Sequence, residues 1–249
     1  MTHPTPPFSP RIRRGSPAVV AIDGPAASGK SSTAQWVAEQ LGYRHVDSGA
    51  LYRAATAARL AAGGTSEAWT EESVLEAARR ITLIARGTSF VPAIDGRPVD
   101  ERIRDGEVTR HVSEVARMPR VRDWVNAQVR RAASQSDVVV DGRDIGTVVL
   151  PQATLKVFLV ADPWERASRR LLQRLGRRAT DEEIAEETDR LVQRDANDAT
   201  QTLQAKDAIL IDTTYLTQAD QVERIVALAR AVTQHPDTTS SIDDQPPRG

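Results

Sequence analysis

The sequence predicts an α/β fold built on a parallel five-stranded sheet with helices on both faces. The first observation is a set of four short apolar runs, each followed by a polar turn and a helical pattern. The second is that these runs are continuously apolar, as in strands buried on both faces. The third is a strand, a Gly-rich turn and a helix in direct succession, which is half of a βαβ unit. The four runs lie at residues 18–23, 137–141, 155–160 and 208–212.

The first strand and the helix after it have clear ends. The run at 18–23 stops at Gly24, and from Lys30 onward apolar residues recur with helical spacing until Gly42, a residue type favoured just after a helix. The apolar face of this helix consists of Ala34, Val37, Ala38 and Leu41. A short segment at residues 45–47 is predicted to supply the fifth strand.

The rest of the chain divides into a folded domain with one insertion and two tails. Residues 1–16 are Pro-rich and residues 235–249 are polar with hardly any apolar side chains, so both are predicted to be disordered and the domain to span residues 17–234. Between about 81 and 99 the pattern alternates and contains an Asp-Gly turn. We expect a small antiparallel ribbon there, inserted into the α/β core.

Composition excludes several classes of function. Among 249 residues, 33 Lys and Arg balance 34 Asp and Glu, which gives a net charge of −1 and no sign of a nucleic-acid partner. The absence of Cys excludes disulfides, thiolate nucleophiles and cysteine-held metal clusters. No apolar run reaches the roughly 18 residues of a membrane span or forms a secretory signal. We therefore expect a cytoplasmic protein that binds no membrane.

A phosphate-binding loop follows the first strand. Residues 24–31 read GPAASGKS and fit the pattern G-x-x-x-x-G-K-[ST] at every specified position. The glycines permit a turn whose N–H groups point inward at the positive end of the helix dipole, Lys30 bridges the β- and γ-phosphates, and Ser31 holds Mg²⁺. The sequence thus predicts ATP and Mg²⁺ as cofactors. The predicted nucleotide-binding residues are Gly24, Pro25, Ala26, Ala27, Ser28, Gly29, Lys30, Ser31 and Ser32.

Two further features narrow the class of P-loop protein. No Asn-Lys pair occurs, although a GTPase needs one in its base-reading motif, so a small-molecule phosphotransferase is favoured at this chain length. Asp141 ends an apolar strand, where it either orients the water shell of Mg²⁺ or merely caps the next turn. The four histidines are not grouped with other potential catalytic or metal-binding residues in the sequence, so we predict no chemical role for them.

Seven segments together resemble the bacterial cytidylate (CMP/dCMP) kinase family. They are IDGPAASGKSS (22–32), VDSGALYRA (46–54), SEVARMPRVR (113–122), VVVDGRDIGTVV (138–149), RASRR (166–170), QRDANDA (193–199) and DAILIDTTYLT (207–217). The resemblance implies a P-loop nucleoside-monophosphate-kinase fold. It also implies an acceptor-binding insertion at about 63–118 and a mobile lid at about 163–180; a solvated charged helix is the less favoured alternative for the lid segment.

The resemblance also implies roles for particular residues. Contacts with the acceptor nucleotide are implied for Ser48, Gly49 and Arg53, and contacts with its cytosine for Ser113, Arg122 and Asp144. Arg143 is implied to contact the acceptor phosphate, and Arg194 and Asp198 to contact ribose and phosphate. Arg169 is implied to contact ATP from the lid. Lys30, Arg143 and Arg169 are the expected catalytic residues. At Gln201 the sequence departs from the family pattern, which has an arginine there, so one phosphate contact is either missing or supplied by a neighbour such as Arg190.

Side-chain chemistry agrees with these roles. A carboxylate at Asp144 accepts a hydrogen bond from the N4 amino group of cytosine and repels O4 of uracil, while Arg122 donates to O2 and N3. The guanidinium group of Arg143 suits a phosphate because it donates two parallel hydrogen bonds and stays charged. The expected protein is a monomeric kinase that converts MgATP and CMP or dCMP to ADP and CDP or dCDP. A kinase for UMP or a nucleoside, and a non-catalytic nucleotide-binding module, are the alternatives.

Overall fold

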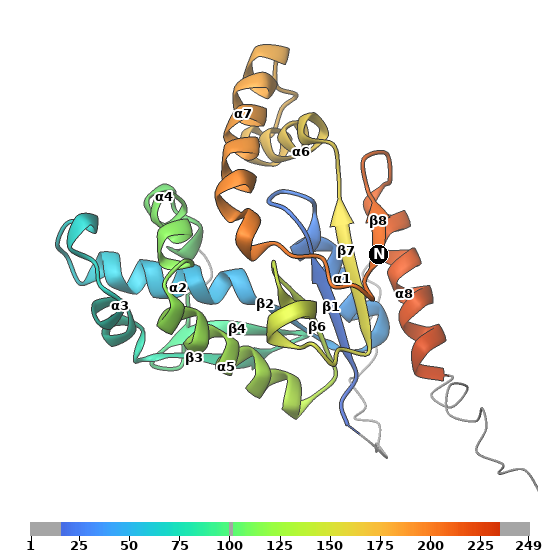
Figure 1. Cartoon of the computed structure of the whole chain (residues 1–249), viewed down its shortest axis with the longest axis horizontal. Helices are drawn as coiled ribbons and strands as arrows, with labels where there is room; N and C mark the ends of the chain where they lie inside the picture. Colours follow the sequence, from blue (N-terminus) through green and yellow to red (C-terminus); the bar gives the residue numbers. More distant parts are fainter. Residues whose placement is uncertain (1–15, 100–101, 235–249) are drawn as a thin grey trace, which may run out of the picture.

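The computed structural model describes residues 16–99 and 102–234 (Figure 1). Within them, one eight-stranded sheet has the order β3-β4-β2-β6-β1-β7-β8, with β5 beside β4. The five predicted strands are consecutive parallel neighbours in this sheet, which confirms the α/β fold. They are β2 (Arg44–Asp47), β6 (Val138–Asp141), β1 (Val19–Asp23), β7 (Leu155–Val160) and β8 (Ile209–Asp212).

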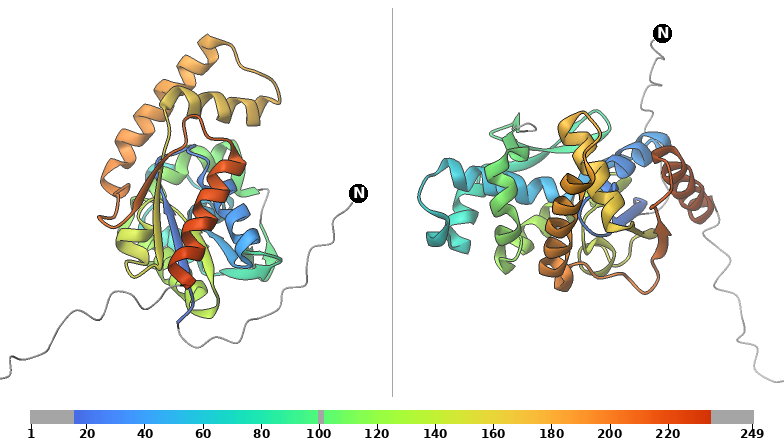
Figure 2. Two further views of the ribbon diagram at one scale, coloured as in Figure 1. Left: turned by 90° about the vertical axis from the view of Figure 1, so that its right-hand side faces the viewer. Right: turned by 90° about the horizontal axis from the view of Figure 1, so that it is seen from above.

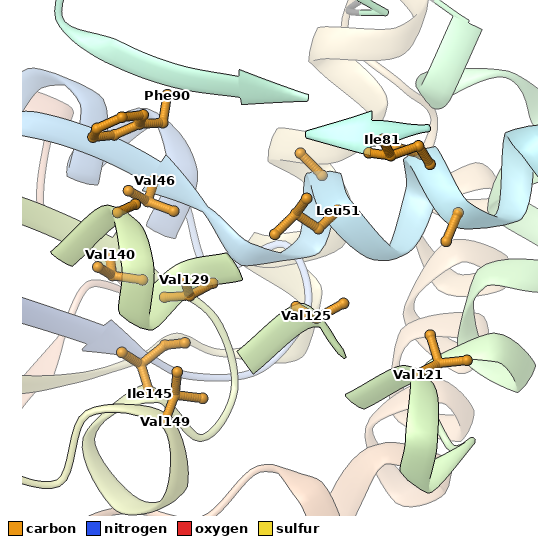
Figure 3. Packing of buried hydrophobic residues seen from close by; sticks show 14 of the residues in the cluster. Val46, Leu51, Ile81, Phe90, Val121, Val125, Val129, Val140, Ile145 and Val149 are labelled. Atoms are coloured by element: carbon orange, nitrogen blue, oxygen red, sulfur yellow. The ribbon is translucent and has the colours of Figure 1, made fainter. Parts of the chain in front are cut away.

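Helices cover both faces of the sheet, and alternate residues of a strand contact opposite layers. Val46 packs with α2 (Ser48–Ala61) and α5 (Pro119–Gln135) in one cluster, part of which is shown in Figure 3. Ile22 packs on the other face with α1 (Lys30–Leu41) and α8 (Gln218–Gln234). These two apolar layers fix the carboxyl ends of β1 and β6, where the motifs lie.

Helix α1 has the bounds that the sequence predicts. It begins after Gly29 and ends at Gly42, and both glycines have left-handed backbone angles, with φ of 87° and 67°. The N–H of Gly42 donates to the carbonyls of Ala38 and Glu39 and so satisfies the last turn. The strong turn signals at both ends explain why this prediction is accurate.

The inserted ribbon is part of the main sheet, so the predicted number of five strands is wrong. Strands β3 (Ile81–Arg86), β4 (Ser89–Ile94) and β5 (Arg97–Pro98) pair antiparallel with one another as expected. Strand β4 also pairs in parallel with β2, where Phe90 lies opposite Val46. This pairing brings Phe90 into the same apolar cluster as Val46, which favours extension of the sheet over a separate ribbon.

The burial of strand β8 differs from the prediction. Its continuous apolar run predicts burial on both faces, yet Leu210 is 55% exposed and Ile209 is 39% exposed. Only Ile211 of this strand is buried, against the cluster that includes α8. The strand lies at the edge of the sheet in the described part of the chain, so one of its faces has no covering layer.

The remaining elements lie at the sides and top of the sheet. Helices α6 (Pro163–Leu175) and α7 (Asp181–Asp198) form a hairpin that rises above the carboxyl ends of the strands (Figure 2). The predicted lid consists of α6 and the turn after it, and its motion stays a prediction. Elements not yet named are η1 (Ser66–Ala68), α3 (Glu71–Ala78), η2 (Arg102–Arg104), α4 (Gly106–Val115), η3 (Ile145–Val149) and η4 (Ala199–Gln201).

The predicted disordered tails lie outside the described residues, apart from Ser16, which is exposed. In the described ranges, the structure contains no helix that combines the length and the apolar character of a membrane span.

Candidate active site

The phosphate-binding loop joins β1 to α1 in a conformation that depends on glycine. Gly24 and Gly29 have φ values of 147° and 87°, and Ala27 between them is also left-handed, with φ of 58°. Alternation of such angles turns backbone N–H groups toward the inside of the loop, which forms a concave anion site. The N–H of Ala26 already donates to a carboxylate oxygen of Asp195 at 3.2 Å, so the loop does bind an anionic oxygen.

Replacing Gly24 by alanine is expected to destabilise the fold. A Cβ atom at Gly24 would lie 2.2 Å from the backbone oxygen of Leu159, which cannot move away without disturbing β7. We expect Gly24→Ala to lower the free energy of unfolding by about 3 kcal/mol or more, measured by urea denaturation. Gly42→Ala is the matched control, because Gly42 is left-handed too but has open space around it. Equal losses for the two variants would contradict this account.

The amine of Lys30 lies inside the loop. Its Nζ donates to the carbonyl of Pro25 at 2.5 Å and to the hydroxyl of Ser28 at 3.4 Å. Burial, with the nearby positive charge of Arg143, lowers the pKa of Lys30 to about 7. The amine is therefore only partly charged at neutral pH when no nucleotide is bound.

Above pH 7, Lys30 is expected to take up a proton when a nucleotide binds. A bound triphosphate places negative charge beside Lys30 and raises its pKa again, so at pH 8 the neutral amine gains about one proton on binding. Calorimetry of ATP binding in two buffers with different ionisation enthalpies measures this uptake. We expect Lys30→Met to abolish the uptake at pH 8. Proton uptake of the same size in that variant would contradict the assignment.

The two predicted metal residues lie side by side at the start of α1. The hydroxyl of Ser31 donates to Oδ2 of Asp141 at 2.5 Å, and Oδ1 of Asp141 lies 2.7 Å from Nε2 of His45. Both carboxylate oxygens thus contact side chains, which argues against a mere turn-capping role for Asp141. Burial alone would lower the pKa of His45, but the hydrogen bond and charge of Asp141 outweigh it and raise that pKa.

A buried carboxylate connects the phosphate-binding loop to the acceptor side. Asp23 ends β1, and its two oxygens accept the N–H groups of Ile145 and Gly146, each at 2.8 Å. Burial raises the pKa of Asp23 to about 6, despite these two hydrogen bonds. Because η3 follows directly after Arg143 and Asp144, this contact fixes those two residues relative to Lys30.

One cavity of about 250 Å³ begins at the phosphate-binding loop and ends at α5. Lys30 and Ser31 line one end of it, and Arg122 and Asp144 line the other. The structure brings all nine predicted acceptor residues to its wall. They are Ser48, Gly49, Arg53, Ser113, Arg122, Arg143, Asp144, Arg194 and Asp198.

The far end of the cavity holds an ion pair between the half-buried Arg122 and the buried Asp144. Nη2 of Arg122 donates to Oδ2 of Asp144, and Nη1 donates to the carbonyl of Ala116 and to Oε1 of Gln201, each at 3.1 Å. Burial raises the pKa of Asp144, and the charge of Arg122 opposes that shift. Gln201 therefore contacts Arg122 and lies at the predicted base-reading end rather than among the phosphate-binding arginines.

Arginines gather in the middle of the cavity. Nη1 of Arg143 donates to the carbonyl of Gly24 at 3.2 Å and Nη2 to Asp198 at 3.0 Å, so this side chain lies between the two ends. Arg53 donates to the hydroxyl of Thr109 at 2.9 Å. Burial and the positive charge of Arg194 lower the pKa of Arg53 to about 10, which leaves it charged at neutral pH. This part of the cavity suits an anion.

The structure places Arg169 outside the cavity. Its Nη2 donates to the carbonyls of Thr213 and Thr214, each at 2.7 Å. Arg166, one turn earlier on α6, contacts the phosphate-binding loop instead: its Nη1 donates to the carbonyl of Ala26 at 2.9 Å and to Asp195 at 2.6 Å. Arg190 pairs with Glu186 and Glu187 rather than reaching this cavity.

Sequence reasoning missed several residues of the cavity wall. Asn126 is buried one helical turn after Arg122 on α5. Its spacing of four residues from Arg122 indicates that both side chains lie on the same face of the helix, and this could have identified Asn126. Tyr52 lies in the segment VDSGALYRA, and the sequence predicts no role for it. Burial raises the pKa of Tyr52 to about 12. Arg170 also lines the cavity and lies in the segment RASRR, again without an assigned role, whereas no pattern in the sequence distinguishes Arg104 from the other arginines.

The residues around Ser31 fit a magnesium ion that is shared with a nucleotide. A hydroxyl and a carboxylate, both hard oxygen donors, meet at the mouth of the phosphate-binding loop. In the described part of the chain, no group of three or more His, Asp or Glu side chains is arranged to hold a metal alone. The site therefore fits an ion that takes most of its ligands from phosphate and water.

Known proteins resemble this chain over most of its length. The cytidylate kinase of Alkaliphilus oremlandii is 40% identical over 86% of this chain and 98% of its own length. That of Desulfitobacterium hafniense is 44% identical over 84% and 91%. The match with a solved gluconokinase from Sinorhizobium meliloti 1021 covers 92% of this chain and all of that chain, with 16% identity and a TM-score of 0.43. The family model for cytidylate kinase matches residues 20–231, and the chain belongs to the cytidylate kinase family.

Proposed function

We propose that this protein transfers the γ-phosphoryl group of ATP to CMP or dCMP and forms CDP or dCDP. The proposal rests on one observation above all. A single cavity has the phosphate-binding loop with Lys30 at one end and the Arg122–Asp144 ion pair at the other. An acceptor nucleotide held with its base at the far end directs its phosphate toward the loop.

The arginines between the two ends are proposed to hold the acceptor phosphate. Arg143 already bridges the carbonyl of Gly24 and the carboxylate of Asp198, so small rotations bring its two donors to a phosphate. Arg53 and Arg194 are proposed as further contacts, and Ser48 and Gly49 as part of the acceptor wall. Since the attacking phosphate oxygen is already anionic, no general base is needed, and catalysis consists of alignment and dispersal of charge.

The base is proposed to be read by Asp144, Arg122 and Ser113. Asp144 accepts from N4 of cytosine, and Arg122 donates to O2 and N3. The contact between Arg122 and Gln201 leaves the remaining guanidinium N–H groups to meet the base. A uracil would place its O4 against the Asp144 carboxylate, so UMP is expected to be the poorer acceptor.

Mg²⁺ is proposed as the second cofactor, with Ser31 and Asp141 beside it. When bound, it neutralises charge on the β- and γ-phosphates. Arg169 stays a predicted catalytic residue that must turn from the carbonyls of Thr213 and Thr214 when the lid closes. Arg166 is a second candidate at the same loop. A cytoplasmic, monomeric state without nucleic-acid or membrane partners also stays a prediction.

An acceptor panel tests the proposed reaction. ADP release, measured by a coupled assay, is compared for CMP, dCMP, UMP, AMP, GMP, cytidine and uridine at fixed MgATP. We expect CMP or dCMP to give the highest kcat/KM. A higher value with UMP or with a nucleoside would favour one of the other acceptor kinases. No acceptor-dependent release, combined with salt-sensitive RNA binding, would favour a nucleotide-binding module instead.

A further inference from the structure

His45 is a buried histidine that the reaction outlined above does not use. It lies in β2 opposite Val139 of β6 and is only 8% exposed. Because successive strand residues face opposite sides, Val46 joins the cluster with α2 and α5 while His45 faces the side on which α1 packs. Val139 and Asp141 share that side of β6. The strand register therefore places the imidazole beside Asp141.

The contact of His45 with Asp141 has a defined direction. Nε2 lies 2.7 Å from Oδ1 of Asp141, and because a carboxylate only accepts, Nε2 carries the hydrogen. The other oxygen, Oδ2, accepts from the hydroxyl of Ser31 at 2.5 Å. Three side chains thus form a continuous chain from β2 through β6 to the first turn of α1.

A carboxylate needs such support when its orientation matters. The terminal torsion of an aspartate is broad, so one hydrogen bond leaves the plane of the carboxylate free to rotate, whereas partners on both oxygens fix it. The contact of Ser31 with Asp141 can be lost, because the Ser31 hydroxyl is also the group proposed to bind Mg²⁺. When Ser31 turns to the metal, His45 is the side chain that still holds Asp141.

We infer that His45 is a positioning residue that holds the Asp141 carboxylate toward the metal-bound nucleotide. The inference rests on the proposed function only in requiring that the phosphate-binding loop binds a nucleotide together with a divalent metal. It does not depend on the acceptor. Partners of this kind typically change metal affinity by about tenfold to 100-fold when they are removed.

Two variants of the full chain separate the hydrogen bond from the packing of the ring. His45→Gln keeps a donor at nearly the same distance along the side chain, and His45→Phe keeps the ring but has no donor. Binding of Mn²⁺ to the ADP complex is measured without turnover, from the EPR signal of free Mn²⁺. We expect His45→Phe to weaken Mn²⁺ binding by about tenfold to 100-fold and His45→Gln to restore most of the affinity. ADP affinity without metal should stay unchanged.

Two controls decide whether His45 acts through Asp141. His111→Phe changes a histidine on α4 that contacts Trp69 outside the cavity, and it should leave Mn²⁺ affinity unchanged. In an Asp141→Ala background, His45→Phe should have no further effect on Mn²⁺ binding. Thermal melts of every variant report folding, and His45→Asn, whose amide is too short to reach Asp141, replaces His45→Phe if that variant unfolds.

Several results would overturn the inference. Wild-type Mn²⁺ affinity in His45→Phe, even with a lower melting temperature, would make the His45–Asp141 contact purely structural. A loss of the same size with and without the Asp141 carboxylate would mean that His45 acts by another route. Because CMP is absent from this assay, failure of the acceptor panel would leave these outcomes unaffected, and the two proposals fail independently.

Discussion

Lys30→Met is expected to lower kcat for phosphoryl transfer by about 100-fold to 1000-fold, with MgATP and CMP both saturating. Methionine keeps the length of the side chain but removes the ammonium group that lies inside the phosphate-binding loop. The charge that develops on the transferred phosphoryl group then lacks its nearest positive partner. Initial rates of ADP release measure the effect.

Lys206→Met is the matched control for this change. Lys206 is exposed and lies outside the residues that line the cavity, so its replacement should leave kcat within about twofold of the wild type. A kcat for Lys30→Met within tenfold of the wild type would contradict the role of the lysine. An unchanged melting temperature would show that the loss is chemical rather than structural.

Asp144→Ala is expected to lower kcat/KM for CMP by about tenfold to 150-fold and to change kcat/KM for UMP far less. The variant removes the acceptor for N4 of cytosine and also removes the charge that repels O4 of uracil. Arg122 keeps its contacts with the carbonyl of Ala116 and with Gln201, so it should stay in place. Steady-state kinetics with both acceptors measure the change in preference.

The control for Asp144→Ala is an acid on the surface of the same region. Asp123 is exposed next to Arg122 on α5, and Asp123→Ala should leave the CMP:UMP preference unchanged. Equal losses for CMP and UMP in Asp144→Ala, accompanied by a lower melting temperature, would mean that the Arg122–Asp144 pair supports the fold without reading the base.

Much of the cavity could be predicted because its residues follow local signals. The phosphate-binding loop is a contiguous motif between a strand and a helix, and Arg143 and Asp144 come directly after a buried strand. Lys30 and Arg143 are both predicted to be catalytic, and the carboxyl ends of the parallel strands that precede them meet at one edge of the sheet. Their shared cavity agrees with that expectation.

Other features depend on geometry that sequence patterns do not contain. The contact between His45 and Asp141 requires the register of β2 against β6, and a shift of one residue would turn His45 to the other face. Arg166 and Arg169 lie three residues apart on one face of α6, so the placement of that helix over the sheet decides which of them contacts the phosphate-binding loop. The pairing of β4 with β2 is likewise decided by packing across the sheet.

The orientation of the acceptor nucleotide is tested most directly by a crystal structure of the protein with CMP and a non-hydrolysable ATP analogue. The account predicts the amino group of cytosine within hydrogen-bond distance of Asp144, and the CMP phosphate at Arg143, facing the terminal phosphate of the analogue beside Lys30. A cytosine bound elsewhere, with the Arg122–Asp144 pair closed over an empty cavity, would contradict it.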